Sequence, residues 1–148
     1  MVDPFRQAEL NRALEELHFA FRAVIAGPDA ILAERGLSRV HHRILYFVAS
    51  TPNLQVNELR ATLNVTKQAL NAPLRELTAR GFIAESIDTN DRRIKHLRLT
   101  PKGRALEERV SGDQRDRFAR VFAQVGPKKE QAWREVMRLL ATDAAETE

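Results

Sequence analysis

The stretch VNELRATLNVTKQALNAPLRELTARGFI, residues 56–83, predicts two helices joined by a tight turn. Apolar residues at helical spacing indicate a short helix over residues 56–63 and a second helix that ends near Arg80. Thr66 is a good N-cap for the second helix, and Gly81 is a good residue to end it. A connection of about three residues between two such helices has the proportions of a helix-turn-helix.

The second helix separates leucines from polar side chains. At about 100° per residue, its leucines share one side and basic and amide side chains occupy the other. Arginine suits guanine in the major groove of DNA, and asparagine or glutamine suits adenine. An ordinary solvent-facing helix would look similar taken alone, so the neighbouring elements decide between the two interpretations. The residues expected to contact DNA from this helix and its cap are Thr66, Lys67, Gln68, Asn71 and Arg75.

A β-hairpin with a charged tip is predicted directly after the second helix. Residues 82–87 (FIAESI) and 95–100 (KHLRLT) have the composition of strands, and the turn-forming residues 88–91 lie between them. A disordered charged linker is the alternative, and it fails because hydrophobic residues alternate on both sides of the tip. Thr100 followed by Pro101 predicts the start of another helix.

Further helices flank this central region. The first is expected over residues 7–25, ended by Gly27 and Pro28, and Ser38 is expected to cap another that reaches about residue 50. Two more helices are expected after Pro101, separated at Gly126 and Pro127. The first helix is apolar on more than one side, which favours contact with both its own core and a second subunit. Its apolar stripe consists of Leu10, Leu14, Leu17, Phe21 and Val24.

The positive charge is concentrated in the middle of the chain. Residues 39–104 hold 12 Lys and Arg against 5 Asp and Glu, although the net charge of the whole chain is only +4. A solvated basic surface would spread its charge evenly. The concentration therefore makes nucleic acid the first partner to consider.

Composition excludes several other classes of protein. The 148 residues, 43% apolar and 30% charged, suit one folded domain, and the absence of cysteine excludes disulfides and thiolate metal sites. No stretch approaches the roughly 20 apolar residues of a membrane span, and no signal-peptide pattern is present, so we expect a cytoplasmic protein without a membrane partner. The four histidines form no HExxH motif, and neither GxSxG nor a glycine-rich phosphate loop occurs. We therefore expect no enzyme, no metal and no cofactor.

Residues 37–103 resemble the MarR/SlyA family of bacterial winged helix-turn-helix regulators. The family's wing typically has Asp-x-Arg, five residues, Leu-Thr and a glycine three residues later. This chain has Asp91-Arg92-Arg93, five residues, Leu99-Thr100 and Gly103. The resemblance implies a mainly α fold with a small β-hairpin wing, organised as one MarR-like domain over residues 1–148. Residues 5–35 and 104–148 would then supply dimerisation helices.

The resemblance also implies a function. A homodimeric, sequence-specific regulator would bind a pseudo-palindromic operator in double-stranded DNA, and a repressor is the expectation, although the residues leave an activator open. The helix of residues 66–80 would enter the major groove. Arg92 or Arg93 would reach the minor groove or its phosphates, with Asp91 holding the wing arginine by a charge-assisted hydrogen bond. Further candidates for DNA contact are Ser38, Arg39, His41, Asn90 and Lys95.

Three positions depart from the family pattern. Pro73 removes a backbone donor inside the recognition helix and is expected to kink it. Glu85 stands where relatives often carry a base, and Asn90 stands at a wing-tip position that is frequently arginine. These departures keep open a second function, a winged-helix protein-interaction module that has lost specific DNA binding.

Family members often hold a small aromatic or anionic effector between the dimerisation helices and the DNA-binding lobe. An aromatic set with a cation is available here to meet a carboxylate. Simple core packing is the alternative explanation for these side chains. The candidate effector residues are Phe19, Phe21, Arg22, His42 and Tyr46.

Overall fold

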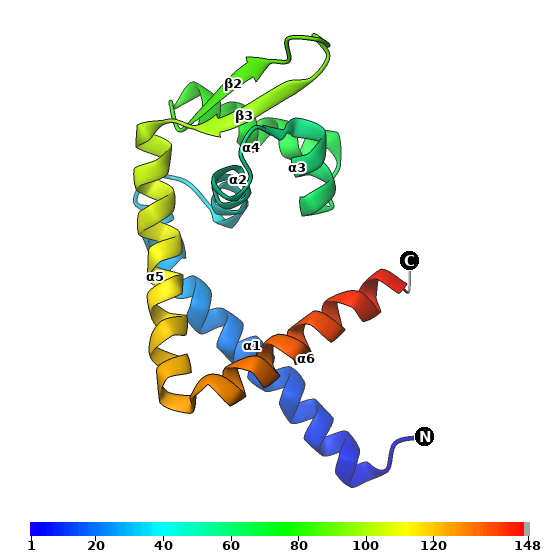
Figure 1. Cartoon of the computed structure of the whole chain (residues 1–148). Helices are drawn as coiled ribbons and strands as arrows, with labels where there is room; N and C mark the ends of the chain where they lie inside the picture. The colour runs from blue at the N-terminus through cyan, green and yellow to red at the C-terminus, as the bar shows by residue number, and fades with distance from the viewer. Residues whose placement is uncertain (147–148) are drawn as a thin grey trace. The chain divides into compact units, whose positions relative to one another are not determined.

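The computed structural model describes residues 1–146, and their side chains as far as Asp143. The chain forms two compact units, residues 1–114 and the residues from Arg115 onward. The predicted fold class, mainly α with a small antiparallel wing, is confirmed (Figure 1). Among the described residues, no helix combines the length and hydropathy needed to cross a bilayer. The elements are α1 (Pro4–Ala33), α2 (Arg39–Ser50), β1 (Leu54–Gln55), α3 (Val56–Leu63), α4 (Lys67–Ala79), β2 (Ile83–Ile87), β3 (Lys95–Leu99), α5 (Pro101–Val125) and α6 (Pro127–Glu146).

The predicted helix-turn-helix is present as α3 and α4. The side chain of Thr66 caps α4 by accepting a hydrogen bond from the backbone N–H of Ala69 (3.1 Å), and Gly81 follows the helix with φ of 79°. The leucine side of α4 is buried against the rest of the lobe. The helix continues through Pro73. The proline cannot donate to the carbonyl of Ala69, and because Ala69 is exposed, water can bond that carbonyl.

The wing belongs to a three-stranded antiparallel sheet in the order β1-β3-β2. In the hairpin Ile83 pairs with Leu99 and Ile87 pairs with Lys95, which buries Leu97 and Leu99 toward the helices. The third strand, β1, was not predicted because two residues are too few to show a strand period. It pairs with β3 and thereby joins the start of α3 to the wing.

The prediction that Gly27 and Pro28 end the first helix was wrong, since α1 continues to Ala33. Pro28 cannot donate to the carbonyl of Val24, and the side-chain amide of Gln114 on α5 donates to that carbonyl instead (3.4 Å). Gly27 lies against the carboxylate of Asp113, where a Cβ atom would overlap it. Gly27 and Pro28 therefore lie where α1 packs against α5 and do not end the helix.

The start of α5 is fixed to the connection between α4 and β2. Thr100 accepts a hydrogen bond from the backbone N–H of Gly103 (3.0 Å), as expected for the predicted N-cap. A Cβ atom on Gly103 would overlap the carbonyl oxygen of Phe82, so only glycine allows this approach. The Lys102 ammonium lies over the Phe82 ring at 4.4 Å from its centroid.

The second unit contains the end of α5 and α6, joined at Gly126 as predicted. Its centre is an aromatic cluster of Phe118, Phe122 and Trp133, whose ring centroids lie 5.4–5.5 Å apart. Large apolar side chains nevertheless remain exposed on α6, among them Val136, Leu139 and Leu140.

Candidate nucleic-acid interface

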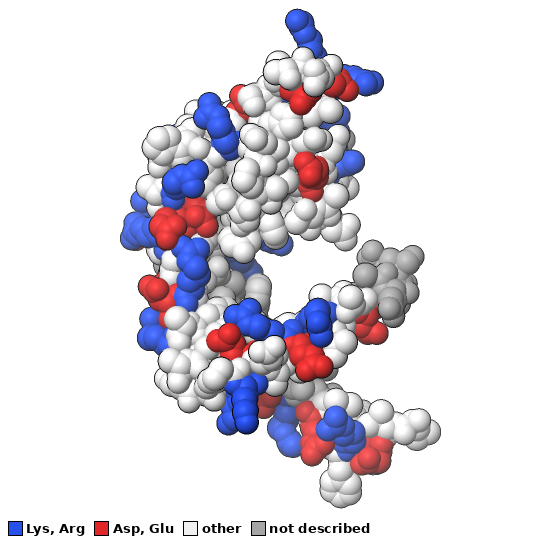
Figure 2. All heavy atoms as spheres, viewed as in Figure 1, with Lys and Arg blue, Asp and Glu red and all other residues white. Residues whose placement is uncertain are grey.

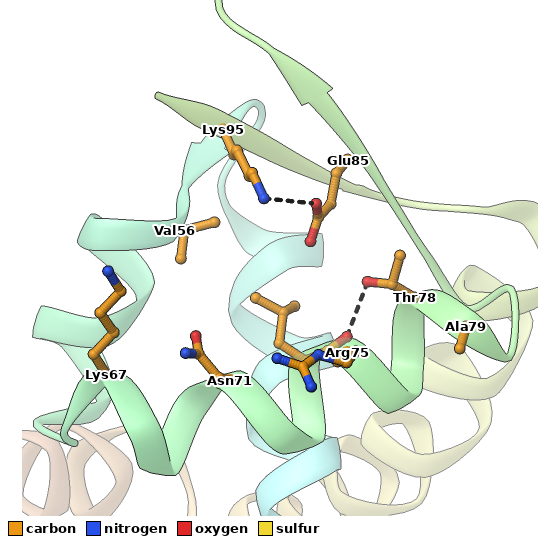
Figure 3. A pocket seen from close by; sticks show the side chains of 9 residues that line it. Val56, Lys67, Asn71, Arg75, Thr78, Ala79, Glu85 and Lys95 are labelled. Atoms are coloured by element: carbon orange, nitrogen blue, oxygen red, sulfur yellow. Dashed lines mark hydrogen bonds and ion pairs between the residues drawn. The ribbon is translucent and has the colours of Figure 1, made fainter. Parts of the chain in front are cut away.

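A groove of about 510 Å³ separates the polar side of α4 from the wing. Lys67, Asn71 and Arg75 line it from α4, and Glu85 and Lys95 line it from the two strands of the hairpin (Figure 3). The Lys95 ammonium and the Glu85 carboxylate form an ion pair at 3.7 Å across the hairpin. The groove thus presents amide and basic groups around one carboxylate whose charge Lys95 partly balances.

A second groove of about 250 Å³ shares Lys67, Asn71 and Lys95 with the first and extends to Arg93. The structure therefore brings together predicted residues from the recognition helix and from the wing. Three residues that the sequence pattern did not indicate also line this second groove, at the junction of β1 and α3: Gln55, Val56 and Asn57. The pairing of β1 with β3 brings this junction beside the wing, and that pairing left no local signal in the sequence.

The tip of the wing holds an arginine that is aligned by its neighbour. Nε of Arg93 donates to Oδ1 of Asp91 and its terminal nitrogen donates to Oδ2, both at 3.1 Å. These side-chain hydrogen bonds hold the pKa of Asp91 below its ordinary value, and the hydrogen bond from the backbone N–H of Arg93 adds a smaller effect in the same direction. Asp91 thus makes the contact that the family resemblance implied, and Arg93 remains 89% exposed. Basic side chains project from this tip in Figure 2.

The remaining candidates from α4 and the wing lie outside both grooves. Thr66 is occupied as the N-cap of α4, and Gln68 is exposed in its first turn. Asn90 and Arg92 are exposed at the wing tip.

The candidates near the start of α2 are not brought to the grooves. Arg39 is ion-paired with Asp29 at 3.4 Å. His41 is only 7% exposed, and the backbone N–H of Ser38 donates to its Nδ1 (3.0 Å). Nε2 of His41 then carries the ring proton and donates to the Glu76 carboxylate on α4 (3.0 Å). Both ring nitrogens are therefore engaged inside the lobe, between α2 and the recognition helix.

The proposed effector residues have mixed surroundings. His42 is 7% exposed, and its Nε2 forms a hydrogen bond with the hydroxyl of Ser111 on α5 (3.0 Å). Burial lowers the pKa of His42, and the charge of Asp29 opposes the shift. Phe19, Phe21 and Tyr46 are 62%, 53% and 43% exposed, Arg22 is exposed, and none of the five lines either groove described above.

A helix-turn-helix followed by a basic hairpin, with a groove between them, defines a winged helix-turn-helix protein. The sequence model of the MarR family matches residues 35–94. The transcriptional regulator PetP of Rhodobacter capsulatus is 36% identical over 136 residues, which cover 92% of this chain and 82% of PetP. The chain belongs to the MarR family, and it is therefore a DNA-binding transcriptional regulator rather than an enzyme.

One further relative and one solved structure with the same fold are also similar to this chain. The transcriptional repressor Rv2887 of Mycobacterium tuberculosis is 30% identical over 115 residues, covering 78% of this chain and 83% of the repressor. Its crystal structure with p-aminosalicylic acid superposes with a TM-score of 0.59 over 86% of this chain and 96% of that one. The structure of Streptococcus pneumoniae FabT with DNA, 18% identical, gives a TM-score of 0.82 over 94% and 99% of the two chains.

Proposed function

We propose that the chain is a homodimeric repressor that binds a pseudo-palindromic operator in double-stranded DNA. One observation carries the proposal: polar residues of α4 line grooves together with basic residues of the wing. Lys67, Asn71 and Arg75 line the first groove with Lys95. Lys67 and Asn71 also line the second groove with Lys95 and Arg93. The amide and guanidinium groups of α4 have the chemistry that recognises base edges in a major groove. Residues 37–103 are the DNA-binding lobe in this account.

In the proposed complex, α4 enters the major groove and the wing follows the adjacent backbone. Asn71, Arg75, Lys67 and Gln68 contact bases or nearby phosphates. Arg93 reaches the minor groove or its phosphates with its guanidinium already aligned by Asp91. Further residues make weaker contacts with the sugar-phosphate backbone of the DNA. They are Ser38, Arg39, Thr66, Asn90, Arg92 and Lys95.

We assign His41 a positioning role instead of a DNA contact. Its ring is buried and bridges the cap of α2 to Glu76 on the recognition helix. Glu76 also accepts a bond from Arg80 (3.4 Å), and Arg80 donates to the carbonyl of Arg35 at the end of α1 (2.8 Å). This chain of contacts holds the end of the recognition helix against the start of α2 and the end of α1.

Exposed apolar side chains support the proposed homodimer. Leu14, Leu17 and Phe21 on α1 are 67%, 50% and 53% exposed, although they form the apolar stripe that the sequence predicted. Such a stripe on one subunit is suited to cover its copy on a second subunit. Two recognition helices would then meet successive major grooves about 34 Å apart. Sedimentation velocity tests the dimer, and a monomer at micromolar concentration would contradict it.

We further propose that an aromatic carboxylate is the effector. The support is the complex of Rv2887 with p-aminosalicylic acid, because that repressor is 30% identical to this chain. Candidates for the contact are Phe19, Phe21, Arg22, His42 and Tyr46. Addition of p-aminosalicylic acid to the protein–operator complex is expected to release DNA, and benzyl alcohol is the uncharged control. Unchanged affinity with the acid at millimolar concentration would contradict this assignment.

Selection of bound fragments from a random duplex library tests the DNA-binding proposal. The expected product is an inverted repeat whose half-sites lie about 10 base pairs apart, centre to centre. A reporter gene placed behind that operator then tests repression. Enrichment without any repeat symmetry would contradict the dimeric mode of binding, and activation of the reporter would contradict the assignment as a repressor.

A further inference from the structure

His96 lies on β3, at the base of the wing, with both ring nitrogens against oxygen atoms. Nδ1 is 2.9 Å from the carbonyl oxygen of Asn53, in the turn before β1. Nε2 is 2.8 Å from Oδ1 of Asp88, at the end of β2. A backbone carbonyl and a carboxylate can only accept hydrogen bonds, so both contacts are satisfied together only when both ring nitrogens carry protons. The geometry therefore selects the imidazolium cation.

Asp88 connects this cation to the tip of the wing. While Oδ1 faces His96, Oδ2 accepts the backbone N–H groups of Asn90 (2.9 Å) and Asp91 (3.0 Å). The backbone N–H of Asp88 in turn donates to the carbonyl of Ile94 and closes the tip (2.9 Å). Asp91 is the residue that aligns Arg93. An unbroken series of contacts thus runs from the His96 ring to the exposed guanidinium.

We propose that His96, in its protonated form, is a positioning residue for DNA binding, because its contact with Asp88 fixes the wing tip that presents Arg93. This role rests on the proposed DNA contact of the wing. Deprotonation would leave one ring nitrogen with a lone pair facing an acceptor, which breaks one of the two contacts. Loss of one contact, together with loss of the positive charge beside Asp88, would weaken the hold on the wing tip as the solution becomes more alkaline.

The groups around the His96 ring favour its protonated form. The hydrogen bond to Asp88, followed by that to Asn53, raises the pKa of His96 above its ordinary value. The same hydrogen bond is the largest cause of the lowered pKa of Asp88. Glu58 on α3 adds a further attraction. Along β3 the cations are Lys95, the adjacent residue, whose side chain points to the opposite face of the strand, and Arg98, two residues on and on the same face as His96. The register partners of His96 carry no charge; they are Gln55 on β1 and Ser86 on β2.

A histidine with a raised pKa contributes fully at low pH and loses its contribution as pH rises through that pKa. We therefore expect operator affinity to fall by about fivefold between roughly pH 6 and pH 9, at the low end of couplings between sites. His96→Lys keeps a cation beside Asp88 over this range, so its affinity should change little with pH. His96→Gln has no cation, and its affinity should be low and equally flat.

His18→Gln is the matched control, because it removes an exposed histidine on α1 and should keep the pH profile of the wild type. Nuclear magnetic resonance of the free protein provides a second readout that needs no DNA. The backbone amide signals of Asn90 and Asp91 should shift with the same midpoint as the His96 ring. Signals that stay constant while His96 titrates would overturn the proposal.

The two readouts distinguish this inference from the proposed function. If His96 and the tip amides titrate together but no duplex binds at any pH, the contact within the wing stands and the DNA-binding role fails. A pH profile of DNA affinity in His96→Gln that matches the wild type would instead overturn the positioning role while leaving DNA binding intact.

Discussion

Arg93 and Asp91 form a two-point ion pair at the tip of the wing, with both N–O distances at 3.1 Å. The pair places an acidic residue in a surface that is otherwise suited to an anionic partner. Because the carboxylate fixes the guanidinium plane, less side-chain entropy is lost when the arginine meets a phosphate or a narrow minor groove. The acid therefore supports DNA binding through the arginine that it orients.

Arg93→Ala is expected to weaken binding to every duplex by a similar factor. A wing arginine contributes through phosphates and groove shape more than through base edges, so the order of preferred sequences should remain. Competition binding with a panel of operator variants measures both quantities. Arg134→Ala on α6 is the matched control, since it also removes an ion-paired arginine, and it should leave affinity unchanged.

Asn71→Ala should instead alter the preferred base at one position of each half-site. Asn71 lines both grooves from the centre of α4, and an asparagine that forms two hydrogen bonds to adenine supplies about 1–3 kcal/mol of discrimination. The measurement is a repeated selection from the random library with the variant. An unchanged consensus would contradict a base contact by Asn71. If affinity fell equally for all sequences, Asn71 would contact a phosphate instead.

Gly103→Ala is expected to destabilise the first unit by about 1–3 kcal/mol, as overpacking does in other cores. The added methyl group would meet the carbonyl oxygen of Phe82, and backbone cannot move aside as a flexible side chain can. Urea unfolding measures the change in the free energy of unfolding. Arg104→Ala, at the neighbouring exposed position of α5, controls for helix propensity and should have little effect.

His42 should make the protein less stable in acid. Its pKa is lowered by burial, so the neutral ring is favoured in the folded state, and this contribution is lost as pH falls below the ordinary value of about 6.5. Unfolding free energies at about pH 7.5 and pH 5.5 should therefore differ less in His42→Gln than in the wild type. The pKa of His96 is raised, so His96 stabilises the folded state at low pH. The contribution of His42 is therefore read from the difference between the His42 variant and the wild type. An equal difference in both proteins would show that His42 does not titrate on unfolding.

Local signals in the sequence predicted the elements that carry DNA recognition. The bounds of α3, the Thr66 cap, the glycine after α4 and the start of α5 at Pro101 all depend on residues close together in the chain. The Asp91–Arg93 pair is equally local, and the family resemblance indicated it.

The features that were missed depend on partners distant in the sequence. The helix passes Pro28 because Gln114 bonds the carbonyl that proline leaves free, and no pattern near Pro28 reveals this. His41 and His42 are buried because Glu76 and Ser111 lie opposite them. The contact between His96 and Asp88 requires the register of the hairpin, which the sequence does not specify.

The salt dependence of operator binding tests the central claim most directly. If basic groups of the wing and α4 contact phosphates, the logarithm of the association constant should fall linearly with the logarithm of salt concentration, by about 0.9 per phosphate neutralised. Arg93→Ala should reduce that slope by about one for each subunit. Fluorescence anisotropy with the selected duplex provides the measurement. A steep linear dependence with a reduced slope in the variant is the expected result, and affinity that is independent of salt would contradict the account.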